Sequence, residues 1–158
     1  MKKEKAGMMG IIEIVHRGKD GEVKEKRLVR NKITNAGLAA ITAVLLTDVT
    51  GNEFDYIAVG TGTTAAAATD TALETEITDS GLARAAGTGS RVTTTVTNDT
   101  AQLTKTFSVT GSKAVTEVGM LNAASAGDLL ARQVFSALNV VNGDSLAITW
   151  KIVFTETA

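Results

Sequence analysis

The carboxy-terminal part of the chain alternates apolar and other side chains with great regularity. Its apolar residues recur at every second position, at Leu146, Ile148, Trp150, Ile152 and Phe154. Successive side chains of a β-strand point to opposite faces, so a period of two places all of them on one side. The segment therefore predicts a strand with one face in a hydrophobic core. Trp150 is the only tryptophan of the chain and is expected to lie in that core.

Other strand-like segments, most of them rich in β-branched residues, lie at 11–16, 23–30, 54–59, 91–97, 103–109, 115–121 and 129–135. Turn-forming residues separate several of them: Asp20-Gly21, Asn98-Asp99 and Asn142-Gly143-Asp144. Gly, Asn and Asp supply the backbone geometry of tight turns. Short strands joined in this way predict a mainly β fold, namely an antiparallel β-sandwich or a jelly-roll-like barrel.

One segment has the spacing of a helix. Leu38, Ile41 and Leu45 fall on one helical face, and Thr34 or Asn35 can cap the amino end. This pattern predicts an α-helix of about three turns that packs on the sandwich and ends near residues 47–48. A second capping pattern, Thr71 followed by Glu74, predicts one short helical turn.

Basic side chains are concentrated near the amino end. Residues 1–32 carry 10 of the 16 Lys and Arg residues but only 5 of the 17 Asp and Glu residues. We expect residues 1–10 to form an arm and residues 11–158 to form a single β-sandwich domain. The basic part is either a solvated hairpin or an arm that docks on an acidic protein surface. Nucleic-acid binding is disfavoured because Glu residues alternate with the basic ones, which lowers the local positive potential.

The sequence contains no motif that demands catalysis, a cofactor or a metal. Cysteine is absent, the carboxylates are scattered, and the single histidine, His16, is expected on the surface beside Arg17. Residues 60–65 fit the G-x-G-x-x-G/A dinucleotide fingerprint, but no crossover helix and apolar strand follow them, so we expect a flexible loop. We therefore expect neither an enzyme nor a cofactor. No apolar stretch approaches the roughly 20 residues of a membrane span, so synthesis in a cytoplasm is expected.

Several segments taken together resemble a family of small virion proteins of tailed bacteriophages. The resemblance runs from about residue 28 to 155 and is carried by 31–37, 56–65, 70–76, 117–123, 129–136 and 142–150. Such proteins are capsid decoration (cement) proteins or small tail and fibre components. The resemblance implies no catalytic residue. It implies a symmetric oligomer, a trimer being favoured, that is assembled in the host cytoplasm and binds the major capsid protein or other virion proteins.

Two segments are expected to contact the capsid or a neighbouring subunit. The first is the unpatterned, Lys-rich amino end, with Lys2, Lys3, Lys5, Met8 and Met9 as contact residues. The second is the small-residue loop 60–68, with Thr61, Thr63 and Thr64. A tail-fibre or tail-tip component would share the fold and the resemblance, so the sequence leaves the choice between head and tail open, together with the oligomer number.

Overall fold

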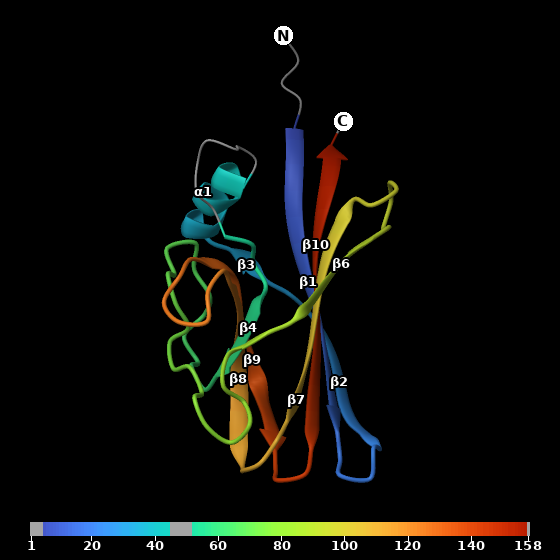
Figure 1. The fold of residues 1–158 in the computed structure, drawn as a ribbon, viewed down its shortest axis with the longest axis vertical. Helices are drawn as coiled ribbons and strands as arrows, with labels where there is room; N and C mark the ends of the chain where they lie inside the picture. Colours follow the sequence, from blue (N-terminus) through green and yellow to red (C-terminus); the bar gives the residue numbers. More distant parts are fainter. Residues whose placement is uncertain (1–4, 45–51, 158) are drawn as a thin grey trace.

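A computed structural model describes residues 5–44 and 52–157, and it consists of two five-stranded antiparallel sheets that face each other (Figure 1). Sheet A has the order β2-β1-β10-β7-β6, with bounds β1 (Lys5–Arg17), β2 (Val23–Arg30), β6 (Thr88–Val92), β7 (Thr100–Ser108) and β10 (Ser145–Thr157). Sheet B has the order β3-β9-β8-β4-β5, with bounds β3 (Lys32–Ile33), β4 (Tyr56–Gly60), β5 (Ala85–Ala86), β8 (Lys113–Leu121) and β9 (Leu129–Val140). The mainly β, sandwich-like prediction is confirmed, and neither sheet closes into a barrel over the described residues.

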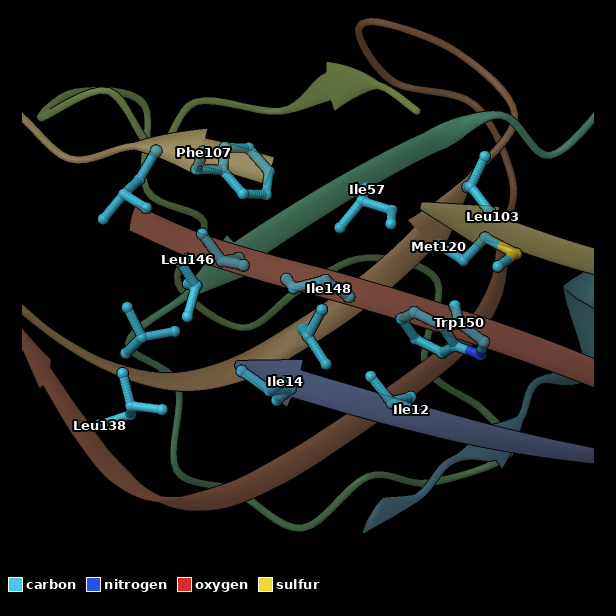
Figure 2. Close-up of a cluster of buried hydrophobic side chains, with 14 of the residues drawn as sticks. Ile12, Ile14, Ile57, Leu103, Phe107, Met120, Leu138, Leu146, Ile148 and Trp150 are labelled. Atoms are coloured by element: carbon cyan, nitrogen blue, oxygen red, sulfur yellow. The ribbon is translucent and has the colours of Figure 1, made fainter. Parts of the chain in front are cut away.

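The core lies between the sheets and is built from alternating positions of the long strands. β10 contributes Leu146, Ile148 and Trp150, and β1 contributes Ile12 and Ile14 (Figure 2). Trp150 is 0% exposed, which confirms the predicted core position. Phe154 continues the same period but is 51% exposed, so its predicted core position is wrong. At that end β1 and β10 extend beyond the facing sheet (Figure 1), so little remains there to cover the ring.

β1 begins earlier than the sequence suggested. It pairs with β10 along its whole length, from Lys5 opposite Thr157 to Arg17 opposite Ser145. Residues 5–10, expected as part of an arm, are therefore backbone-paired members of sheet A. Residues 1–4 lie outside the described residues. The described ends of β1 and β10 lie side by side at one end of the molecule (Figure 1).

The predicted helix is present as α1 (Asn35–Val44). Thr34 is its N-cap, because Thr34 Oγ1 accepts a hydrogen bond of 2.9 Å from Gly37 N. Gly37 is required there, since a Cβ would lie 2.5 Å from the carbonyl oxygen of Leu130. The helix thus packs directly on β9. The predicted end near residues 47–48 falls outside the described residues.

The predicted turns are present at the ends of the hairpins. Gly21, Asn98 and Gly143 all have the positive φ that such turns require. However, β6 ends at Val92 and not near residue 97. The side chain of Asp99 accepts hydrogen bonds of 2.8 Å from the backbone N–H groups of Thr94, Thr95 and Val96. These bonds lower the pKa of Asp99 far below its ordinary value and fold the segment into a loop instead of a strand.

Candidate functional site

The predicted amino-terminal contact residues that the structure describes are part of sheet A. Lys5 is the first residue of β1, and Met8 and Met9 lie opposite Phe154 and Val153 of β10. Both methionines are half-buried, and Met8 packs against the core. Lys2 and Lys3 lie outside the described residues. At least one member of this predicted contact set therefore contributes to the packing of the domain.

The three predicted threonines lie on the loop that follows β4 in sheet B, so they do not share a strand or a sheet with the methionines. Thr63 and Thr64 are exposed, and Thr61 is half-buried. Thr64 donates hydrogen bonds of 2.7 Å from its backbone nitrogen and 2.8 Å from its hydroxyl to the carboxylate of Glu74. The predicted helical turn at Thr71–Glu74 is wrong for this reason. The Glu74 carboxylate holds the threonine loop and does not cap its own segment. The hydrogen bonds from Thr64 lower its pKa.

A buried ion pair that sequence reasoning missed lies beneath this loop. Glu117 of β8 is 0% exposed and Arg132 of β9 is 2% exposed. Arg132 Nε donates a hydrogen bond of 2.8 Å to Glu117 Oε2. The same carboxylate accepts bonds from the backbone nitrogens of Gly62 (3.0 Å), Glu74 (3.0 Å) and Thr75 (2.7 Å). Glu117 therefore fastens two separate parts of the 61–76 loop to sheet B.

Two further carboxylates complete the surroundings of Arg132. Its Nη1 donates a bond of 2.9 Å to Asp70 Oδ2, and its Nη2 lies 3.5 Å from Glu74 Oε2. Burial alone lowers the pKa of Arg132, but its hydrogen bonds to Glu117 and Asp70 raise the pKa above the ordinary value. The guanidinium is thus a fixed positive charge, and every carboxylate of the group is already engaged with a protein donor or with that charge.

The Gly-x-Gly pattern of the loop has its physical cause in this ion pair. A Cβ at Gly60 would lie 2.4 Å from Glu117 Oε1, and a Cβ at Gly62 would lie 2.5 Å from the same atom. Both glycines are therefore needed so that the loop backbone can approach the buried carboxylate. No described helix begins after the pattern, in contrast to a dinucleotide-binding loop, whose glycines admit a pyrophosphate at a helix start.

Four of the six segments that carry the family resemblance meet at this buried ion pair. Segment 56–65 supplies Gly62, and segment 70–76 supplies Asp70 and Glu74. Segments 117–123 and 129–136 supply the ion pair itself. A signal was present in the sequence, because each charge interrupts an apolar strand. The paired register of β8 and β9 was needed to join them, since Gly119 lies opposite Arg132 and Glu117 lies opposite Val134.

His16 is not on the surface, so that prediction is wrong. The His16 residue is 3% exposed, and its Nε2 lies 2.6 Å from Asp144 Oδ2. Asp144 also accepts bonds from Lys24 Nζ (2.8 Å) and from the backbone nitrogen of Val141 (3.1 Å). Burial raises the pKa of Asp144, but these hydrogen bonds outweigh burial and lower its pKa to about 2. The cluster ties the first hairpin to the turn before β10.

An apolar cavity of about 380 Å³ opens between the sheets beside α1. Leu103, Met120, Leu130 and Ile152 form its inner wall, and Val44, Phe54 and Phe154 lie toward its mouth. Two of the inner residues, Leu103 and Met120, are labelled at one end of the core (Figure 2). Both charged residues among the described lining, Glu53 and Asp55, are acidic.

Among the described residues, no group of three or more His, Cys, Asp or Glu side chains is placed to hold a metal ion. Within the part of the chain that the structure describes, no helix combines the length and the apolar character that a membrane crossing requires. No family model, curated protein or solved structure matches the chain.

Proposed function

We propose that this protein is a structural component of a tailed-bacteriophage particle, and specifically a capsid decoration protein that binds the outside of the head lattice. It acts without catalysis or cofactor, as a homo-oligomer for which a trimer is favoured. Its partner is the major capsid protein. The proposal rests on the family resemblance of residues 28–155 together with what the resembling segments do in the fold.

The observation that carries the proposal is the convergence of four resembling segments on the Glu117–Arg132 ion pair. Each Glu117 oxygen accepts two hydrogen bonds from protein donors. A general base or nucleophile needs a lone pair that can reach a substrate. The residues of these four segments therefore support a structural role, in which they hold a loop in place, and not a catalytic role.

A decoration protein stabilises its particle by mass action. Each copy binds the assembled lattice and not the free capsid subunit, so binding shifts the equilibrium toward the assembled state. Such a role requires a rigid surface presented in many copies. The loop 61–76 fits this requirement because Glu117 and Arg132 of sheet B bind it from below, while Glu74 holds its Thr64 segment from within the loop.

Electron microscopy of native particles labelled with an antibody against this protein tests the proposal. We expect regularly spaced label over the outer surface of the head. Label confined to the tail would instead establish the alternative, a tail-fibre or tail-tip component. Absence of label from purified particles, with the protein present in the infected cell, would refute a virion role.

A further inference from the structure

We propose that the apolar cavity beside α1 is a docking site for a polypeptide segment of the lattice protein. The segment inserts one aromatic or large aliphatic side chain and carries Lys or Arg beside it. The identity of this partner rests on the proposed decoration role, whereas the chemistry of the site is argued from the cavity itself.

The size and lining of the cavity fit a side-chain anchor. Its volume of about 380 Å³ is within the range of about 300–1,000 Å³ that is typical of binding pockets. The inner wall is supplied by both sheets, through Leu103 and Ile152 of sheet A and Met120 and Leu130 of sheet B. An inserted apolar group would therefore contact both layers of the sandwich.

The mouth of the cavity indicates a polypeptide occupant. Val44 of α1 and Phe154 of β10 both line it and are 52% and 51% exposed. The apolar surface thus continues outward from the cavity onto a helix and a strand. An occupant that covers the anchor site and both flanks must be extended, as a chain segment is. Large apolar anchors at the centre with a polar rim are the usual anatomy of protein interfaces.

The negative charge at the mouth of the cavity favours basic residues on either side of the inserted side chain. Glu53 and Asp55 are the charged members of the described lining, and both come from the segment that leads into β4. A basic residue next to the inserted side chain would pair with them, whereas an acidic neighbour would be repelled. Rim charges contribute more to specificity than to affinity, so the preference for a basic neighbour is the measurable signature.

Three capped tripeptides test this inference on the full chain. Acetyl-Lys-Phe-Lys-amide carries the proposed anchor and charges, acetyl-Glu-Phe-Glu-amide reverses the charges, and acetyl-Lys-Ala-Lys-amide removes the anchor. Each is titrated into ¹⁵N-labelled protein and followed by amide chemical shifts. We expect the first to bind about 3- to 10-fold more tightly than the second, as two exposed ion pairs allow. Its shifts should cluster at Gly89, Leu103 and Leu130, which line the cavity.

Two sets of variants make the test specific. The double change Glu53→Gln and Asp55→Asn should abolish the charge preference and leave the anchor bound. Gly89 of β6 lies opposite the cavity residue Leu103, and a Cβ there would meet no atom within 4 Å. Gly89→Phe should therefore fill the cavity and block binding, while Gly89→Ala, its matched control, should retain it.

Equal affinity for the Lys- and Glu-flanked peptides would overturn the inference, as would equal affinity for the Phe and Ala peptides. Failure of every peptide to bind would do the same. If Gly89→Phe does not fold, the charge variants still decide the question. The titration uses no particle, so its failure is distinguishable from failure of the decoration role, which the labelling experiment tests separately.

Discussion

At the scale of single residues, buried charges distinguish this molecule from a plain apolar sandwich. Glu117 and Arg132 lie on sheet B beneath the 61–76 loop. His16 and Asp144 lie where the first hairpin meets the turn before β10. A buried charge is tolerated only where hydrogen bonds replace its lost hydration. Both clusters meet this condition through backbone N–H donors, so each helps to fix the position of a loop.

Replacing Glu117 by Gln should lower the free energy of unfolding by about 3 kcal/mol or more, the usual cost of breaking a buried pair. The amide would direct N–H groups at backbone or guanidinium donors, and Arg132 would lose its closest carboxylate. Urea denaturation measures the change. The control is Glu13→Gln, which removes the exposed Lys26–Glu13 pair and should cost less than about 1 kcal/mol. Equal effects of the two variants would contradict the anchoring role of Glu117.

Asp144 should make stability depend on acid pH. Its pKa is lowered from 3.8 to about 2 in the folded protein, so the ionised form stabilises the fold above pH 3.8. That contribution is lost as the pH falls toward 2, because the unfolded state takes up the proton first. The difference in unfolding free energy between the wild type and Asp144→Asn should therefore be largest near neutral pH and shrink between about pH 4 and pH 2. A constant difference across this range would show that Asp144 is not held ionised. Glu22→Gln, an exposed change in the neighbouring turn, is the control.

At the scale of elements, local patterns predicted the strands and turns well. The successful predictions depend on residues that are close in sequence. They are the period of two in β10, the turns at Gly21 and Gly143, and the Thr34 cap of α1. The failures depend on contacts between distant segments. Glu74 had the form of a cap, but Thr64 supplied its partner from ten residues away. His16 looked exposed because its partner, Asp144, follows it by 128 residues. The candidate site was predicted least well, since its buried ion pair joins separate strands.

The edge of β9 shows the same dependence on distant residues. β3 pairs with only two residues of β9, Arg132 and Ala131. Farther along, Arg27 of β2 donates hydrogen bonds to the carbonyl oxygens of Ser136 and Ala137, and its guanidinium lies 5.5 Å from the centre of the Phe135 ring. A charged side chain from the other sheet thus occupies backbone acceptors that a further strand would otherwise use, which protects this edge against aggregation.

The pairing of β1 with β10 predicts different effects on stability for a short and a longer truncation of the amino end. Deleting residues 2–4 leaves the described part of β1 intact, so it should lower the thermal midpoint less than a deletion that reaches into β1. Deleting residues 2–10 removes the backbone partners of Ile152–Thr157 and the packing of Met8, so the midpoint should fall by several degrees. Thermal unfolding followed by circular dichroism measures both. Equal midpoints for the two deletions would show that residues 5–10 add no stability to sheet A.

At the scale of the whole molecule, several features gather at one end of the sandwich. The described ends of β1 and β10 and the helix α1 lie there (Figure 1), and the cavity is lined by Val44 of α1 and Phe154 of β10. The opposite end carries the His16–Asp144 cluster and the tight turn at Gly143. Under the decoration role proposed above, the end with the cavity would face the lattice and the compact turns would face outward.

A decoration role predicts that the stability of the head depends on the concentration of this protein. Because each copy binds only the assembled lattice, its contribution follows RT ln(1 + [L]/Kd) per site. Each tenfold increase in free protein above Kd should then add about 1.4 kcal/mol per site, whereas concentrations far below Kd should add almost nothing. Heating heads that lack the protein in increasing amounts of added protein, with disassembly followed by light scattering, measures this dependence. The Glu117→Gln variant should give a weaker response, because its threonine loop loses the anchor that fixes its shape. A disassembly temperature that does not change with added protein would contradict the head assignment, and a tail component would give that result.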